Sequence, residues 1–126
     1  GALKSNNVNA QQLQDAIKKI QANDLNSAIT ELKQVMAGTD KASAASARYF
    51  LSVAYVANNQ YKEAITEANK FVTANAANKN APDALRVIYI SQTQLGNASA
   101  ANATAKRLIK SYPNSEAAKK VAKQIQ

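Results

Sequence analysis

One apolar pattern occurs three times in this 126-residue chain, and it constrains the fold more than any other feature. Each copy places apolar residues at i, i+3, i+7 and i+10, a spacing that puts them on one face of an α-helix. The copies are Leu25/Ala28/Leu32/Val35, Tyr61/Ala64/Ala68/Phe71 and Ala98/Ala101/Ala105/Leu108. Equivalent alanines are 36 and then 37 residues apart. A repeated, all-helical unit is therefore predicted.

Each copy begins two residues after a turn residue, namely Asn23, Asn59 or Gly96. Glycine and asparagine are the residues that best tolerate the left-handed backbone of a tight turn. Further apolar residues at helical spacing precede each turn, so each unit reads as two helices joined by a short turn. A single helical hairpin cannot bury both of its apolar faces, and stacked copies solve this problem.

The predicted organisation is one helical domain over residues 9–126, with repeats at about 9–40, 45–78 and 82–114 and a capping helix over 115–126. Pro82 suits the first turn of a helix, where its missing N–H has no partner in any case. Residues 1–8 are polar and lack periodicity, so we expect a disordered segment or a linker there.

The composition argues against catalysis. The chain has no histidine and no cysteine, which removes the commonest general base, the commonest metal ligand and the thiol nucleophile. Glu63 and Glu67 share a helical face, but beside Lys62 and Lys70 they read as exposed helix charges. We therefore expect no enzyme activity, no cofactor and no metal site.

The charge balance favours a protein partner. Sixteen Lys and Arg against eight Asp and Glu give a net charge of +8. The basic residues are spread along the chain and are not interleaved with aromatic residues, which disfavours a nucleic-acid interface. A basic surface of this kind suits an acidic protein. No apolar run approaches the roughly 20 residues of a membrane span.

Residues 9–113 resemble the tetratricopeptide repeat (TPR) family. The period slightly exceeds the family's value of about 34 residues, and the signature tryptophan is absent. The family's early Leu-Gly pair appears here as Leu51-Ser52 and Ile88-Tyr89. The resemblance implies a right-handed superhelix of three hairpins plus a C-terminal cap, with a concave groove built from the first helix of each hairpin.

Mapped onto this chain, that groove holds ten candidate partner-binding residues: Leu13, Ile17, Ile20, Tyr49, Val53, Val56, Asp83, Arg86, Ile90 and Gln94. Tyr49 is the candidate aromatic anchor and Arg86 the candidate electrostatic one. Two interpretations stay open. The aliphatic residues can instead form core between repeats, and the two charged residues can simply be solvated.

A narrower resemblance lies toward the end of the chain. The stretches APDALRVIYISQTQLGN and KRLIKSYPNSEAAKKVAKQIQ are similar to the C-terminal repeats of the Tol-Pal-associated periplasmic family YbgF/CpoB. This implies a periplasmic location, a TolA-type partner and a role in coordinating cell division in the cell envelope. The SYPNS ending also resembles outer-membrane assembly proteins of the BamD type. A self-associating scaffold, oligomerising through a missing N-terminal region, is a further alternative.

Overall fold

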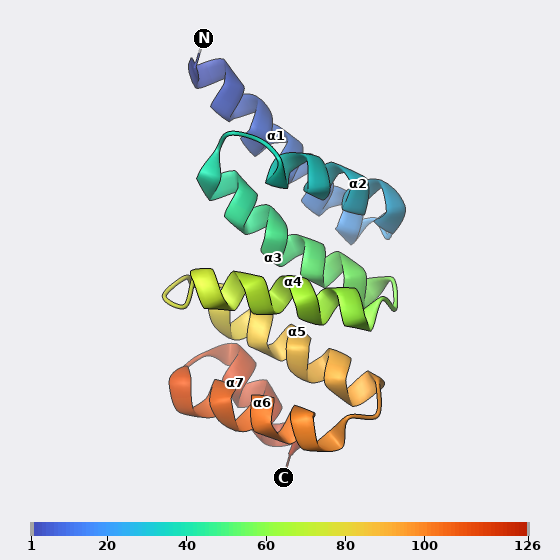
Figure 1. Ribbon diagram of the computed structural model, residues 1–126, viewed down its shortest axis with the longest axis vertical. Helices are drawn as coiled ribbons and strands as arrows, with labels where there is room; N and C mark the ends of the chain where they lie inside the picture. Colours follow the sequence, from blue (N-terminus) through green and yellow to red (C-terminus); the bar gives the residue numbers. More distant parts are fainter. Residues whose placement is uncertain (1, 126) are drawn as a thin grey trace.

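The computed structural model describes residues 2–125, and this part of the chain contains seven helices and no strand. The helices are α1 (Ala2–Gln21), α2 (Leu25–Met36), α3 (Lys41–Ala57), α4 (Tyr61–Ala74), α5 (Ala81–Gln94), α6 (Ala98–Ser111) and α7 (Glu116–Gln124) (Figure 1). The all-α class predicted from the sequence is confirmed.

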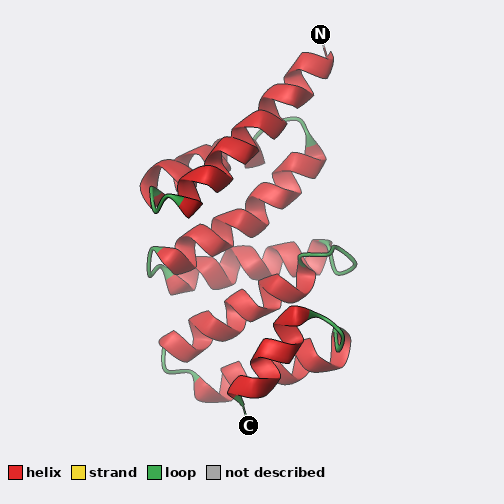
Figure 2. Cartoon of the chain, turned by 180° about the vertical axis from the view of Figure 1, so that it is seen from behind, coloured by secondary structure: helices red, strands yellow, loops and turns green. Residues whose placement is uncertain are grey.

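The helices form two layers. Each helix packs on the next one in the chain, and α1, α3, α5 and α7 also contact one another in that order. Within the described residues, the even-numbered helices make no contact with each other. Figure 2 shows the layer of odd-numbered helices toward the viewer. In this layer, the first helix of each hairpin contacts the first helix of the next hairpin.

The turns inside the three hairpins share one geometry. Asn23, Asn59 and Gly96 have φ values of 62°, 61° and 79°, which confirms the three turn residues predicted from the sequence. Asn23 N–H donates to the carbonyl of Ile20, three residues earlier, and Asp24 N–H donates to the carbonyl of Lys19, five residues earlier, at 2.8 Å. The same pair of bonds recurs after α3 and after α5. It is a Schellman motif, which satisfies the last free carbonyls of a helix.

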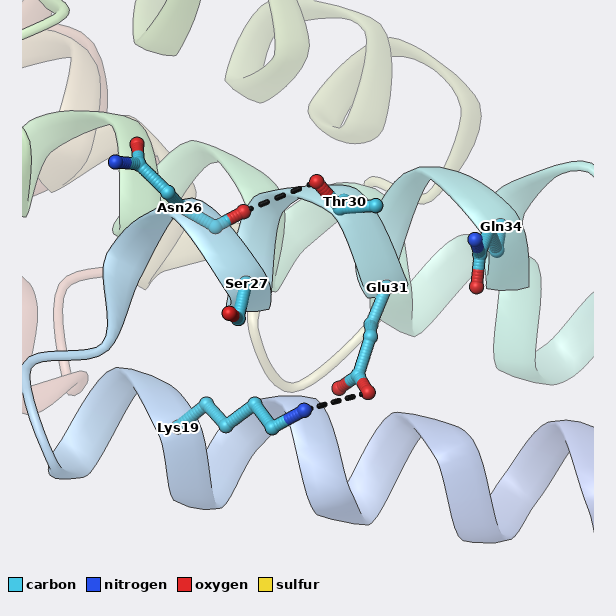
Figure 3. Close-up of a pocket in the computed structure, with 6 residues that line it drawn as sticks. All are labelled: Lys19, Asn26, Ser27, Thr30, Glu31 and Gln34. Carbon is cyan, nitrogen blue, oxygen red and sulfur yellow. Dashed lines mark hydrogen bonds and ion pairs between the residues drawn. The ribbon is translucent and has the colours of Figure 1, made fainter.

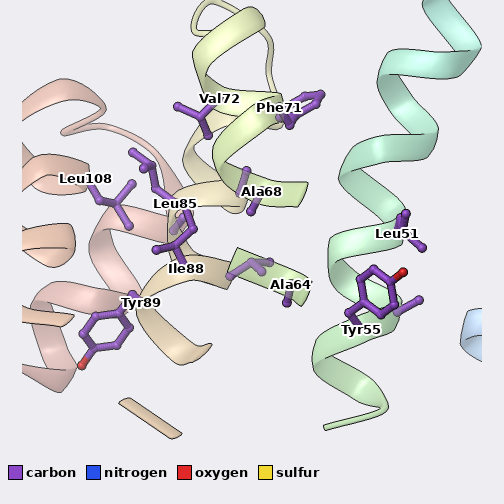
Figure 4. Close-up of a cluster of buried hydrophobic side chains, with 14 of the residues drawn as sticks. Leu51, Tyr55, Ala64, Ala68, Phe71, Val72, Leu85, Ile88, Tyr89 and Leu108 are labelled. Carbon is purple, nitrogen blue, oxygen red and sulfur yellow. The ribbon is translucent and has the colours of Figure 1, made fainter. Parts of the chain in front are cut away.

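The repeated apolar positions form the core. The second, third and fourth positions of every copy are at most 4% exposed: Ala28, Leu32, Val35, Ala64, Ala68, Phe71, Ala101, Ala105 and Leu108. Figure 4 shows the middle of this cluster, where Ala64 and Ala68 of α4 lie among larger side chains of α3 and α5. Small alanines allow the helices to approach closely. The first position is less buried, and Ala98 is exposed.

The first helix begins earlier than expected. Residues 1–8 were expected to form a disordered segment or a linker, but α1 begins at Ala2; Gly1 lies outside the described residues. Nothing between residues 2 and 8 breaks a helix, and adding residues to an existing helix is easy once the first turns have formed. Val8 is 63% exposed, so the apolar period that marks a packed helix is missing at this position.

Two further helix starts have identifiable N-cap residues. α3 begins at Lys41, four residues earlier than expected, with Asp40 at the N-cap position; the Asp40 side chain makes no capping bond to the backbone but accepts a hydrogen bond from Ser43 Oγ. α7 begins at Glu116, after Ser115, whose Oγ accepts a hydrogen bond from Ala118 N–H at 3.1 Å. No helix among residues 2–125 is long and apolar enough to cross a membrane.

Candidate functional site

A pocket of about 310 Å³ lies between α3 and α5, in the layer of odd-numbered helices. Its lining comprises Tyr49, Val53, Val56, Ala57, Asp83, Arg86, Val87 and Ile90. Six of the ten candidate residues therefore meet in one place, three from each helix. Their spacing, i, i+4, i+7 on α3 and i, i+3, i+7 on α5, places each set along one helical stripe.

Tyr49 is held in position by other aromatic rings. Its ring centroid lies 4.9 Å from that of Phe50 and 5.6 Å from that of Phe71 on α4. Burial raises the pKa of the Tyr49 hydroxyl to about 12, and the nearby Asp83 carboxylate acts in the same direction, while Arg86 opposes it. The hydroxyl is therefore protonated at neutral pH and available as a hydrogen-bond donor.

The two charged residues of the pocket are partly buried and do not pair. Burial raises the pKa of the Asp83 carboxyl, whereas Arg86 and Lys120 of α7 lower it. No salt bridge among the described residues involves Arg86, and its buried Nε has no hydrogen-bond partner there. Both side chains are therefore partly exposed and partly covered by the surrounding residues.

The other four candidates lie elsewhere. Leu13 is 7% exposed and belongs to the hydrophobic core. Ile17 and Ile20 are partly buried and pack against the same core from α1. Gln94 is exposed at the end of α5. Core packing, the alternative left open from the sequence, thus describes the residues of α1.

Two lining residues were not predicted. Ala57 follows Val53 by four residues, and Val87 follows Asp83 by four residues, so each continues a helical stripe already identified. The i, i+4 spacing was the available signal. Ala57 is the last residue of α3, and Val87 is 8% exposed.

A larger pocket of about 450 Å³ lies between α1 and α2 and is lined by polar side chains (Figure 3). Here Lys19 Nζ lies 2.6 Å from Glu31 Oε1. Gln92 and Thr104 occupy the equivalent positions two repeats later, and Thr104 Oγ1 donates to Gln92 Oε1 at 2.6 Å. Because the contact recurs between the helices of another hairpin, we interpret it as a brace within the hairpin.

Among the residues that the structure describes, no group of three or more Asp and Glu side chains is placed to hold a metal ion. A scan against models of protein families gives no match for the chain, and no curated protein matches it. The pocket between α3 and α5 is therefore the main structural guide to function.

Proposed function

We propose that this chain is a non-catalytic protein-binding module of the tetratricopeptide type, and that it binds a peptide or helix of a partner on the layer of odd-numbered helices. The observation that carries the proposal is the pocket between α3 and α5, where six of the candidate groove residues meet. The pocket joins two hairpins, so a stack of hairpins is needed to form it.

The repeated construction supports the tetratricopeptide assignment. Three hairpins share the spacing of their core residues, the same Schellman turn and, in two of them, a polar brace at the same position. The first helix of each hairpin contacts the first helix of the next, which is the arrangement that the family's inner surface requires. We propose a right-handed superhelix, with α7 as its cap.

The chemistry of the pocket suits a protein ligand. Val53, Val56 and Ile90 provide apolar walls, and Tyr49 adds an aromatic ring that is already fixed by packing. Pre-ordered aromatic and arginine side chains at the centre of an apolar patch are typical of binding hot spots, because little conformational entropy is lost when a partner docks. The pocket lacks the cysteine and histidine side chains on which many catalytic sites depend.

For the biological setting, the resemblance of residues 81–97 and 106–126 to the YbgF/CpoB family supports a periplasmic protein of the Tol-Pal system. In that setting the partner is TolA, and the role is the coordination of cell division with the cell envelope. The BamD-like and self-associating alternatives share the fold but differ in partner, so direct binding separates them.

The test measures binding of the purified chain to the purified periplasmic part of TolA. Ala57→Trp places a large ring at the pocket mouth, where Ala57 is exposed, and should weaken binding tenfold or more. Ala42→Trp makes the same change at an exposed position at the other end of α3 and should leave affinity unchanged. Equal effects of both variants would contradict the pocket assignment.

The same samples test the alternatives. A wild-type chain that stays monomeric in light scattering and does not bind TolA would overturn the Tol-Pal assignment. A concentration-dependent dimer that Ala57→Trp dissociates would instead support the self-associating scaffold.

A further inference from the structure

Arg86 lines the pocket between α3 and α5, and one of its hydrogen-bond donors has no acceptor. Arg86 Nε is buried, and neither a carbonyl nor a carboxylate of the described residues accepts from it. Asp83 stands three residues earlier on the same helix, a spacing that often forms an ion pair, yet the two are not paired within 4.0 Å. A buried donor left unsatisfied is destabilising, so an acceptor supplied by a ligand would recover that free energy.

The last helix, α7, is basic. It contains three lysines and a single acidic residue, Glu116, whose Oε1 lies 3.7 Å from Lys119 Nζ. On α7, which packs against α5, the exposed residues Lys119, Lys120 and Lys123 form a cationic face. Lys120 lies close enough to Asp83 to lower the pKa of that carboxyl, so the positive field of α7 reaches the pocket. This charge attracts an acidic segment.

From these observations we infer that the pocket binds a partner segment in which a bulky apolar side chain stands next to an Asp or Glu carboxylate. This inference rests on the proposed function and specifies the ligand of the same site. The apolar side chain fills the space between Val53, Val56 and Ile90, and the carboxylate accepts from Arg86. Charged hydrogen bonds of this kind are stronger than neutral ones.

Asp83 allows the charge of the ligand to be tested. Its carboxylate lines the same pocket and carries the charge opposite to that of Arg86, so it repels an acidic ligand. Replacing Arg86 should therefore weaken binding, while replacing Asp83 should leave it unchanged or strengthen it. A basic ligand would reverse both effects, and a purely apolar ligand would respond to neither.

The first experiment selects ligands from a random library of 12-residue peptides displayed on phage, using the full chain as bait. We expect enriched peptides that carry Asp or Glu within two positions of Leu, Ile, Phe or Trp and that Ala57→Trp no longer binds. Enrichment of basic or uncharged peptides at this pocket would overturn the inference and leave the proposed function standing. If every selected peptide still binds the Ala57→Trp variant, the result would count against the proposed function itself.

The second experiment measures the affinity of the most enriched peptide by calorimetry. Arg86→Gln should weaken it about tenfold or more, the range expected for a charged hydrogen bond. Arg107→Gln removes the same charge from an exposed position on α6 and should change the affinity less than twofold. Asp83→Asn should bind equally or more tightly. Circular dichroism checks that each variant is folded.

Changing the peptide instead of the protein avoids any effect on folding. Replacing the acidic residue of the peptide by the matching amide should weaken binding to the wild-type chain by about the same factor as Arg86→Gln does. The same peptide change should have little effect on binding to the Arg86→Gln variant. Equal losses for both proteins would show that the carboxylate does not bind at Arg86, which would overturn the inference.

Discussion

Replacing Gly96 with alanine tests the repeated turn that defines the hairpins. Gly96 has a φ of 79°, and a Cβ added to it would meet no atom within 4 Å. Steric clash is therefore absent, and the cost comes from the backbone alone. The left-handed conformation costs roughly 1–2 kcal/mol per residue for a side chain with a Cβ. Alanine also lowers the conformational entropy of the unfolded chain, which offsets part of this cost. We therefore expect the free energy of unfolding to fall by about 1 kcal/mol.

The assay is urea unfolding followed by circular dichroism at 222 nm. With a slope of about 2 kcal/mol/M, typical of a domain this size, the unfolding midpoint should fall by about 0.5 M. Gly38→Ala is the matched control, because Gly38 does not have a positive φ. There the new Cβ would approach Asn9 Oδ1 at 2.9 Å, but this is the movable end of a side chain.

We expect Gly38→Ala to lose less than about 0.5 kcal/mol, since the alanine backbone is unstrained and the Asn9 side chain can move away. An unchanged free energy of unfolding for Gly96→Ala would refute the reasoning. It would show that the turn after α5 does not depend on the left-handed backbone. An equal loss in both variants would show that the loss at Gly96 does not come from its positive φ.

Three other predictions concern individual aromatic side chains. Phe71→Ala should lower the free energy of unfolding by about 3–5 kcal/mol, measured by urea unfolding, because Phe71 is fully buried. Tyr112→Phe should cost about 0.5–1.5 kcal/mol in the same assay, because it removes the 2.6 Å hydrogen bond that Tyr112 Oη donates to the Ala76 carbonyl. In an absorbance titration at 295 nm, subtracting the curve of the Tyr49→Phe variant from that of the wild type isolates the ionisation of Tyr49. The midpoint of this difference should lie near pH 12; a midpoint near 10 would show that Tyr49 is solvated. Because the unfolded chain ionises this hydroxyl first, the contribution of Tyr49 to stability should fall as pH rises from about 10 to about 12.

The core of the hairpins was predictable because one helical face is buried in every copy. Ala64, Ala68 and Phe71 recur at the spacing that a buried stripe requires, and all three are fully buried. The turn residues were predictable for an equally local reason, since few residue types accept a left-handed backbone. Ala98 departs from the pattern because the first position of each copy lies at the start of its helix, where fewer neighbours cover it.

Other features could not be predicted from a local pattern of residues, either because the sequence carries no such pattern or because they depend on how helices pack in three dimensions. The start of α1 was missed because the sequence of its first turns carries no apolar period. Six candidate groove residues meet in one pocket, but Leu13 at the equivalent position of the first repeat is 7% exposed and belongs to the core. The unpaired Arg86 was also beyond reach, since the sequence spacing favours a pair with Asp83.

The most direct test of the central claim, that the surface between α3 and α5 binds a protein segment, is amide chemical-shift mapping by NMR. The labelled chain is titrated with the periplasmic part of TolA and, separately, with the most enriched library peptide. The account predicts shifts that cluster on α3 and α5 around Val53 and Ile90 and that Ala57→Trp suppresses. Shifts confined to the outer faces of α2, α4 and α6, or no shifts with either ligand, would contradict it.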